Sequence, residues 1–498
     1  MIAGNKFRKL SACEAADFIT DGALVGFSGF TPAGAAKAVP RALAARALAM
    51  HNRGEKFRIR VLTGASTGAA LDDALAEVNA ISWRAPYQSS SALRKLINRQ
   101  ETEFVDMHLS HLPQMVEFGF FGNIDVAVVE AVDVTSDGRV YLSTSVGASP
   151  TFLRHADRVI IELNRHHSKR LPEMHDIRLL PLPPHRSFIP IDHALSRIGT
   201  PFAEVDPAKI IGIVETDEPD GVATFDAPGE CSERIADHVV GFILQEMRLG
   251  RIPPEFLPLQ SGVGNVANAV MARLGQHPDI PPFVMYSEVI QDALVDLLES
   301  GSLRGASATS LTLSEPQLAK VYDNMDFFGS RIILRPQELS NNPGVIRRLG
   351  VIAINTVLEM DITGCANSTH VCGGQVMNGI GGSGDFTRNA YLSFLVAPSI
   401  AKSGKISTVV PMVSHVDHNE HSVQVMVTEQ GLADLRGLGP IERARRIIEK
   451  CAHPMYRDCL FEYLEAAPMG HVRHDLKRCF ELHQNLLETG SMLPLVIA

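Results

Sequence analysis

Glu288 is the residue whose type and position most clearly suggest chemistry. It follows the apolar run Phe283 to Tyr286, which has strand composition, and it precedes apolar residues at helical spacing from Val289 to Leu298. We expect Glu288 at the turn between a strand and a helix, in the first turn of that helix. Ligands of open parallel sheets bind beyond the carboxyl ends of strands, and a helix N-terminus favours a carboxylate. Such a glutamate would be ionised and face a cleft, although acidic residues also begin helices for structural reasons alone.

A second segment with chemical potential is the glycine-rich stretch NGIGGSGDF (378–386), which contains G-x-G-x-x-G at Gly379, Gly381 and Gly384. A dinucleotide fingerprint needs an apolar strand before it and an acidic residue about twenty positions later, and this stretch has neither. Glycine allows backbone N–H groups to approach a ligand closely, and two aligned donors form an oxyanion hole. The stretch therefore predicts either an oxyanion hole for acyl transfer or a structural turn.

The segment SHVDHNEH (414–421) collects possible metal ligands at His415, Asp417, His418, Glu420 and His421. Such a density of imidazole and carboxylate groups can bind zinc. Because apolar strand-like segments lie on both sides, an ordinary hairpin with a polar tip is the alternative that we favour.

Two polar turns, SNNP (340–343) and NSTH (367–370), could orient a carboxylate or a ligand, with ordinary turn chemistry as the alternative. The stretch GASTG (64–68) has the spacing of a G-x-S-x-G elbow, whereas the sequence contains no Walker A loop. The missing Walker A loop makes a P-loop nucleotide-binding protein a poor interpretation.

Composition restricts the partners and the compartment. The 46 basic and 56 acidic residues give a net charge of -10, which argues against a nucleic-acid or an acidic-membrane surface. Seven cysteines without a C-x-x-C pair predict reduced thiols and a cytoplasmic location. Acidic residues near the start are wrong for a targeting peptide, and no uncharged stretch resembles a membrane span.

The elements that must position these residues are those of an α/β protein. Buried-strand candidates rich in β-branched residues predict mainly parallel sheets, and they fall at 24–27, 124–131, 158–164, 210–216, 351–355 and 423–429. The length of 498 residues favours two domains, which we place at 1–220 and 221–498. Residues 257–274 parallel 24–43 as strand, Ser-Gly turn and helix, so the domains are expected to share a plan. The tail at 441–489 is predicted to be helical.

Several of these stretches together resemble the acetyl-CoA hydrolase/transferase family, which are class I coenzyme A transferases. The similar segments run from about residue 10 to the C-terminus, and they are SGFTPAG (28–34), PLQSGVGNVANAV (258–270), YSEVIQD (286–292), NSTHV (367–371), NGIGGSGDFTRNAYLS (378–393) and HVDHNEHSVQVMVTEQGLADLRGL (415–438). Within the family, GRIPPEFLPLQSGVGN, MYSEV and CAHPMYRD are most similar to the propionyl-CoA:succinate transferases.

The resemblance implies a fold, an assembly and a set of site residues. It implies two open α/β domains with the active site at their interface, in a homodimer, and a glutamyl nucleophile at Glu288. Asn341 and Gly382 would be the other catalytic residues. The coenzyme A contacts would be Gln260, Ser261, Gly262, Val263, Gly264, Asn378, Gly382 and Lys402. Coenzyme A would be a substrate, no cofactor would be bound permanently, and the 414–421 segment would hold no metal.

The implied activity is transfer of coenzyme A between small carboxylates, with propionyl-CoA and succinate, or succinyl-CoA and acetate, as the pair. Acyl-CoA hydrolysis is the alternative, in which water takes the glutamyl thioester. A non-catalytic ligand-binding protein is a third hypothesis, although a sensor has no need of a nucleophile. One methylene group is worth only about 1–3 kcal/mol in a pocket, so the sequence leaves the acids open.

Overall fold

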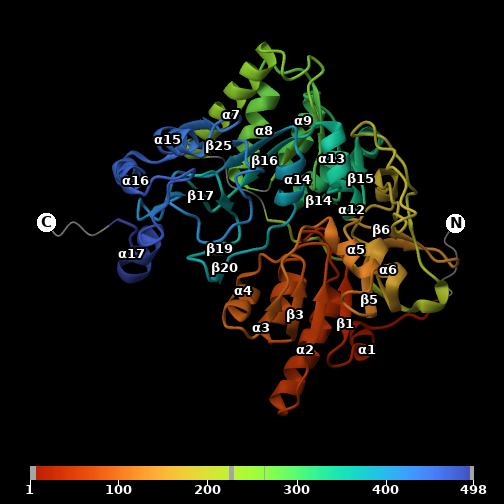
Figure 1. Ribbon diagram of the computed structural model, residues 1–498. Helices are drawn as coiled ribbons and strands as arrows, with labels where there is room; N and C mark the ends of the chain where they lie inside the picture. Colours follow the sequence, from red (N-terminus) through yellow and green to blue (C-terminus); the bar gives the residue numbers. More distant parts are fainter. Residues whose placement is uncertain (1–6, 224–228, 263, 494–498) are drawn as a thin grey trace. The chain divides into compact units, whose positions relative to one another are not determined.

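A computed structural model describes residues 7–223, 229–262 and 264–493. The chain forms two compact units, one of residues 1–224 and 284–349 and the other of residues 225–283 and 350–498. Strands and helices alternate in both, so the predicted α/β class is confirmed (Figure 1). The segment 284–349, which carries Glu288, packs with the N-terminal part of the chain, whereas a division at 220 would group it with the C-terminal part. Independent domains divided at 220 stay a prediction.

The N-terminal part of the first unit is built on a twisted, mainly parallel sheet. Its strands are β1 (Leu24–Phe27), β2 (Ile59–Leu62), β3 (Ile81–Ala85), β4 (Glu103–Phe104), β5 (Ile124–Val134), β6 (Arg139–Leu142), β7 (Ala156–Asn164), β8 (Ala203–Glu204) and β9 (Ile210–Thr216). The order is β4-β3-β2-β1-β5-β6-β8, and β7 pairs with β5 and β9. Only β6 pairs antiparallel, with β5 and β8, among the pairings of this sheet. The apolar runs at 24–27, 124–131 and 210–216 are therefore strands buried among neighbours, as predicted.

Helices cover this sheet because each presents an apolar stripe to it. They are α1 (Ala12–Asp17), α2 (Ala38–Asn52), α3 (Ala74–Glu77), α4 (Ser91–Asn98), α5 (His111–Glu117) and α6 (Ser149–His155). In α2, Val39, Leu43 and Ala47 recur every four residues and are fully buried against strand residues such as Val61. Figure 1 shows α2 and α3 beside the red and orange strands of this sheet.

The segment 284–349 adds a second group of strands and helices to the first unit. Its elements are β11 (Phe283–Tyr286), β12 (Val289–Ile290), α9 (Asp292–Ser300), β13 (Leu303–Ala308), β14 (Ser310–Leu311), α10 (Glu315–Asp323), α11 (Met325–Phe328), β15 (Ile332–Leu334), α12 (Gln337–Ser340) and α13 (Pro343–Leu349). Strands β15, β13 and β11 are neighbours in that order, and β12 pairs in parallel with β14. The polar stretch 165–208 is irregular apart from β8 and the short 3-10 helices Leu171–Met174 and Pro207–Lys209, as expected of a long excursion.

The expected position of Glu288 in the first turn of a helix is wrong. Val289 and Ile290 form β12, and helix α9 begins only at Asp292. Val289 and Ile290 are both β-branched, which favours a strand, and Val289 pairs with Ser310 of β14. The two residues therefore form a strand and not a helical turn. The helix N-terminus therefore does not provide the positive end for the Glu288 carboxylate, and other donors must do so.

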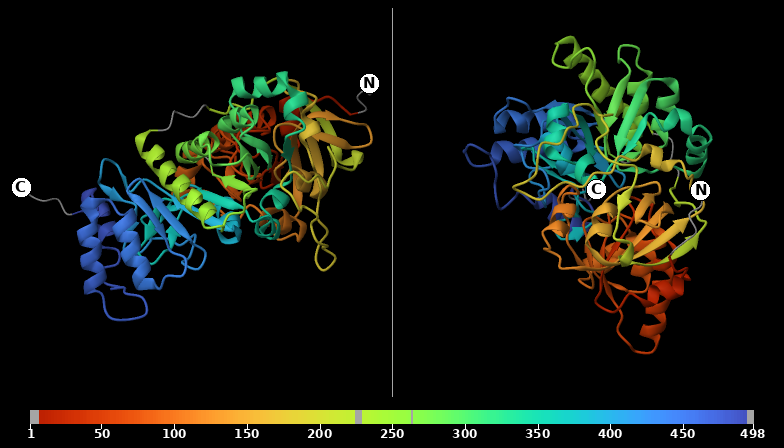
Figure 2. Two further views of the ribbon diagram at one scale, coloured as in Figure 1. Left: turned by 90° about the horizontal axis from the view of Figure 1, so that it is seen from above. Right: turned by 90° about the vertical axis from the view of Figure 1, so that its right-hand side faces the viewer.

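The second unit contains a parallel sheet with a C-terminal helical layer. Its main elements are α7 (Glu230–Arg248), β10 (Leu259–Ser261), α8 (Asn265–Gln276), β16 (Ile352–Thr356), β21 (Leu392–Val396), β25 (Val425–Thr428), β26 (Gly431–Asp434), α15 (Pro440–Cys451), α16 (Pro454–Ala466) and α17 (Glu481–Thr489). Strands β10, β16, β21, β25 and β26 are neighbours in that order, and only the β25–β26 pairing is antiparallel among those described. Figure 2 shows the blue helices of the tail beside strands of the same unit, which confirms the predicted helical tail.

The hairpin expected around residues 414–421 is not formed. The strand before it, β24 (Val409–Val410), pairs in parallel with β17 (Glu359–Asp361), whereas β25 after it pairs with β21 and β26. The two apolar segments thus belong to different sheets, because each finds a parallel partner elsewhere in the second unit. Among the described residues, no helix is both long enough and apolar enough to cross a bilayer.

A buried group of charges lies under the first glycine loop of the first unit, and we call Lys37, Glu130, His167 and Asp220 the Lys37 cluster. Lys37 Nζ lies 2.5 Å from Glu130 Oε2 and 3.1 Å from Asp220 Oδ1. His167 Nε2 lies 3.4 Å and 3.3 Å from the same two carboxylates. Burial opposes the charged imidazole, but the carboxylates of Asp220 and Glu130 outweigh it and raise the pKa of His167 to about 9. Two cations and two anions therefore balance in the interior.

The raised pKa of His167 makes the stability of the first unit depend on pH. The folded protein holds this proton more tightly than the unfolded chain, so the stabilisation is fully present below about pH 6.5 and is lost as the pH rises through about 9. We expect the free energy of unfolding in urea to fall by up to about 3 kcal/mol across this window. In His167→Asn that part of the pH dependence should vanish, and an unchanged slope in the variant would contradict it.

Candidate active site

Glu288 lies just beyond the carboxyl end of β11 and is held through its backbone. Its carbonyl oxygen accepts a hydrogen bond of 2.8 Å from the N–H of Thr309, and the N–H of Ser287 donates one of 2.8 Å to Ser307. Both partners are at the end of β13 or directly after it, so the neighbouring strand determines where the turn goes. The side chain of Glu288 is half-buried.

Asn341 contacts the Glu288 carboxylate directly. It follows α12 as the residue that ends the helix, and its Nδ2 donates a hydrogen bond of 2.5 Å to Glu288 Oε1. Ser340 Oγ in turn donates to Asn341 Oδ1 over 2.8 Å. Asn341 and Ser340 are both fully buried. The structure therefore brings together two of the three implied catalytic residues, Glu288 and Asn341, and it adds a contact from Ser340, which the sequence indicated only as part of the SNNP turn.

Helix α12 is fastened to the loops that follow the strands of the first sheet. The N–H of Gln337 donates to the carbonyl of Gly147 over 3.0 Å, and Gln337 Nε2 donates to the carbonyl of Leu109 over 2.9 Å. Tyr286 OH, two residues before Glu288, donates to the carbonyl of Leu339 over 2.5 Å. Burial raises the pKa of the Tyr286 hydroxyl, so it remains a donor. The helix that carries Asn341 is thus tied to the strand that carries Glu288.

A small apolar cluster next to this turn comes from three loops and from β12. Phe30, Ala65, Leu109 and Val289 are buried together, and the half-buried Tyr87 packs against them. Three of the first four follow β1, β2 and β4, and Val289 directly follows Glu288. Carboxyl ends of parallel strands thus meet beside the glutamate, as an open α/β sheet predicts.

Close backbone approach in these loops requires glycine. Gly29 has φ of +125°, and a Cβ there would lie 2.9 Å from the Cα of Ala35. A Cβ on Gly64 would lie 2.7 Å from the carbonyl oxygen of Gly29. The SGFTPAG and TGASTG loops can therefore pack against each other only because both positions lack a side chain.

Gln260, one of the coenzyme contacts that the resemblance implies, has its side chain engaged within the second unit. Its Nε2 donates to Asn355 Oδ1 over 3.1 Å, and its Oε1 accepts from the N–H of Ile354 and from Asn355 Nδ2 over 3.2 Å each. Asn355 Nδ2 also lies 3.4 Å from Thr387 Oγ1 in α14 (Ser383–Asn389). The end of β10 is thereby tied to the helix that follows the glycine-rich stretch.

The glycine-rich stretch leads into α14 with Gly382 as the residue before the helix. The short strand before it, β20 (Gln375–Val376), pairs only with β19 (His370–Val371) among the described strands, so the stretch does not follow a strand of the main sheet. This arrangement agrees with the rejection of a dinucleotide fingerprint. Asn378 Oδ1 is buried and has no partner within the described part of the chain.

The other implied coenzyme contacts have varied surroundings. Ser261 ends β10, Gly262 follows it, and Gly264 precedes α8 with φ of +122°. Val263 lies outside the described residues. Lys402 is exposed in the turn between β22 (Ile400–Ala401) and β23 (Ile406–Ser407), with φ of +47°.

The histidine-rich segment 414–421 is held by ordinary polar contacts. Asp417 accepts hydrogen bonds from the N–H of Ser368 and from Thr369 Oγ1. His418 is buried, with Nε2 3.2 Å from Ser383 Oγ, whereas the side chain of His421 is 83% exposed. The segment thus supports the NSTH turn and the start of α14.

One other set of possible metal ligands gathers in the described residues, at Glu130, His167 and Asp220. The ammonium group of Lys37 already lies between the two carboxylates of this set. These charges are balanced without an ion, so the arrangement is that of a buried ion-pair network.

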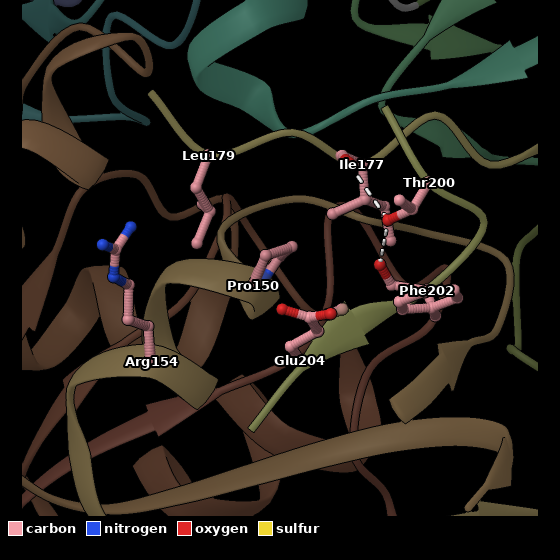
Figure 3. A pocket seen from close by; sticks show the side chains of 8 residues that line it. Pro150, Arg154, Ile177, Leu179, Thr200, Phe202 and Glu204 are labelled. Carbon is pink, nitrogen blue, oxygen red and sulfur yellow. Dashed lines mark hydrogen bonds between the residues drawn. The ribbon is translucent and has the colours of Figure 1, made fainter. Parts of the chain in front are cut away.

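A surface cavity of the first unit does not coincide with the residues that sequence predicted. It has a volume of about 400 Å³ and is lined by Pro150, Arg154, Ile177, Leu179, Thr200, Phe202, Ala203 and Glu204 (Figure 3). Thr200 Oγ1 donates to the carbonyl of Phe202 over 2.8 Å at its edge. The chemistry around Glu288 therefore cannot be assigned to this cavity.

The chain is similar to known proteins over nearly its whole length. Residues 4–215 match the acetyl-CoA hydrolase/transferase N-terminal domain, and residues 318–464 match the corresponding C-terminal domain. The chain is 60% identical to the propanoyl-CoA:succinate CoA transferase of Escherichia coli, over 98% of this chain and 99% of that protein. It is 46% identical to the succinyl-CoA:acetate CoA-transferase of Clostridium kluyveri (97% and 90% covered) and 42% identical to the acetyl-CoA hydrolase of Saccharomyces cerevisiae (97% and 94% covered).

Solved structures share the fold. RipA from Yersinia pestis aligns with a TM-score of 0.69 at 24% identity, over 91% of this chain and 96% of that one. A 4-hydroxybutyrate CoA-transferase from Porphyromonas gingivalis aligns with a TM-score of 0.62 at 22% identity, over 92% and 97%. The α/β fold is therefore shared with these structures over nearly the full chain.

The Tyr286 hydroxyl provides a test of how α12 is held. In Tyr286→Phe the buried carbonyl of Leu339 loses its side-chain donor, so we expect the free energy of unfolding to fall by about 1–2 kcal/mol. Tyr391→Phe is the matched control, because its hydroxyl also donates to a carbonyl, that of Arg251, but the residue is 49% exposed. That variant should lose no more than about 0.5 kcal/mol. If urea unfolding shows the same loss of unfolding free energy in both variants, the hydrogen bond from Tyr286 stabilises the protein no more than an exposed one does.

Proposed function

The chain belongs to the acetyl-CoA hydrolase/transferase family, and from this we propose that it transfers coenzyme A between small carboxylates. The donor and acceptor pairs that we propose are propionyl-CoA with succinate and succinyl-CoA with acetate, since the proteins at 60% and 46% identity are named for these reactions. One observation carries the proposal. The Glu288 carboxylate is half-buried just beyond the end of β11, and it accepts a hydrogen bond from Asn341 Nδ2.

The proposed mechanism keeps the thioester energy on the enzyme. The Glu288 carboxylate attacks the acyl-CoA carbonyl, the C–S bond breaks, and an enzyme-acyl anhydride and the coenzyme A thiolate form. The thiolate then attacks the glutamyl carbonyl of the anhydride and releases the first acid as its carboxylate. The remaining glutamyl-CoA thioester reacts with the acceptor carboxylate by the same two steps in reverse. These half-reactions predict ping-pong kinetics.

Asn341 would act at the glutamyl carbonyl. Each attack on that carbonyl places negative charge on its oxygen, and Nδ2 is a donor already directed at a Glu288 carboxylate oxygen. The donor is fully buried, so its position changes little as charge develops. Asn341 would thus stabilise the intermediates at the enzyme's side of the reaction.

The second unit would supply the coenzyme contacts. These contacts would come from Gln260, Ser261, Gly262 and Gly264, where Asn355 already engages the Gln260 side chain and the N–H of Gly262 donates to the carbonyl of Ile354. The N–H of Gly382 would stabilise the oxyanion on the substrate carbonyl, and Asn378 Oδ1, which has no partner among the described residues, would accept from the coenzyme. Exposed Lys402 would attract its phosphates. An active site at the interface of the two halves, a homodimer and a cytoplasmic location remain predictions that the family resemblance supports.

Acyl-CoA hydrolysis is the second candidate function. The relative from Saccharomyces cerevisiae, which is 42% identical over 97% of this chain, is named acetyl-CoA hydrolase. The two activities would share the glutamyl-CoA thioester. Water would hydrolyse it to Glu288 and free coenzyme A, whereas an acceptor carboxylate would take the coenzyme A. The non-catalytic alternative loses its basis, because the full-length relatives are named as enzymes.

The glutamyl thioester can be trapped. Intact protein mixed with propionyl-CoA or succinyl-CoA, without an acceptor, should gain the mass of coenzyme A less water, and borohydride should reduce the adduct at Glu288. Glu288→Ala should show no adduct and should lose activity by about 10³-fold or more. Glu299→Ala, an exposed carboxylate in α9 of the same unit, is the matched control and should form the adduct normally. Absence of both adduct and turnover in the unaltered protein would disprove the assignment.

Acceptor dependence separates the two candidate activities. Consumption of propionyl-CoA should rise with succinate concentration, and succinyl-CoA should accumulate in equal amount, because a carboxylate must take the coenzyme. A rate that is independent of acceptor, with free coenzyme A as the product, would make the protein a hydrolase.

A further inference from the structure

The Asn341 amide can contact Glu288 in only one useful orientation. An ionised carboxylate has acceptors alone, so the amide must turn its NH₂ group towards Glu288 and its oxygen away. The oxygen then needs a donor in a fully buried environment, and Ser340 Oγ lies 2.8 Å from it. With the amide reversed, two oxygens would face each other across the 2.5 Å contact.

Among the described residues, the Ser340 hydroxyl has one other acceptor within reach, and it is the poorer one. The carbonyl oxygen of Gln337 lies 3.5 Å from Ser340 Oγ, and it already accepts the N–H of Asn341 over 3.0 Å. The hydroxyl proton is therefore better used on Asn341 Oδ1. The hydrogen bonds therefore run in one direction, from Ser340 Oγ to Asn341 Oδ1 and from Asn341 Nδ2 to Glu288 Oε1.

The backbone of this turn does not depend on the Ser340 hydroxyl. The N–H of Ser340 donates to the carbonyl of Pro336 over 3.1 Å, and Tyr286 OH holds the carbonyl of Leu339. Together with the bond from Asn341 N–H to Gln337, these contacts position the Asn341 backbone. Removal of the hydroxyl would thus release the rotation of the amide about its last side-chain bond and leave the main chain in place.

We propose that Ser340 is a positioning residue, which acts on the reaction only by orienting the Asn341 amide towards the Glu288 carboxylate. This assignment deepens and rests on the proposed function. In the glutamyl anhydride and thioester, the same amide N–H would meet the glutamyl carbonyl oxygen as charge develops on it. A reversed amide would place its oxygen there and oppose each attack.

A double-mutant cycle in the full-length protein tests this. With propionyl-CoA and succinate, Ser340→Ala should lower kcat about tenfold, the effect of one hydrogen bond, with KM for propionyl-CoA near that of the unaltered protein. Asn341→Ala should lower kcat about 10²-fold. In the Asn341→Ala background, adding Ser340→Ala should change kcat less than about twofold, because its only route of action is gone.

Two further variants distinguish positioning from a general structural effect. Ser340→Cys keeps a weaker donor of similar size, so its kcat should fall between those of the unaltered protein and Ser340→Ala. Ser149→Ala is the matched control, since that hydroxyl is equally buried in the first unit and has no partner within the described residues. It should leave kcat unchanged.

The outcomes separate the two levels of inference. Normal kcat in Ser340→Ala, or the same loss in both backgrounds, overturns the positioning role while transfer by the unaltered protein and the loss in Asn341→Ala still support the function. If the unaltered protein neither transfers coenzyme A nor forms the Glu288 adduct, the function itself fails, and the role of Ser340 fails with it.

Discussion

The hydrogen bond from Asn341 Nδ2 to Glu288 joins two segments of the first unit that are 53 residues apart, and much of the surrounding structure holds its two ends. On one side, strand β13 anchors the turn that carries Glu288 through Ser307 and Thr309. On the other, α12 is fastened by Gln337 to loops that follow distant strands. A carboxylate that has to be ionised, accessible and stationary needs a donor that does not move, and a buried amide satisfies this better than a flexible surface cation.

Buried charges connect distant segments of the first unit. Arg335, which is fully buried, donates to Asp176 and to the carbonyl of Ser196, and its Nε donates to Ser307 Oγ over 2.7 Å. It thereby ties the irregular 165–208 stretch to the strand next to Glu288. Such pairs add little net stability when intact, but loss of one partner leaves an uncompensated charge in the interior. The same reasoning applies to the Lys37 cluster, which lies beneath the SGFTPAG loop and holds Gly34 through Asp220.

At the positions proposed to contact coenzyme A, the second unit has glycines, amide side chains and the exposed Lys402. Its glycine-rich stretch leads into α14, and Asn355 links that helix to Gln260 at the end of β10. This division suits a reaction whose charge develops on two carbonyl oxygens. One would be served by the Asn341 side chain, and the other by a main-chain N–H such as that of Gly382.

The sequence alone predicted the α/β class, most of the buried strands and the helical tail, because these depend on local apolar periodicity. Its long motifs also placed the proposed nucleophile at Glu288, a role that stays a prediction. It misassigned Val289 and Ile290 to a helix, since a short apolar run cannot be told from a helix without knowledge of its strand partner at Ser310. It also could not find the Lys37 cluster, whose Lys37 and Asp220 are 183 residues apart, or the role of Ser340 beside Asn341. Those contacts have no local pattern, because only the tertiary structure decides which buried polar groups must satisfy one another.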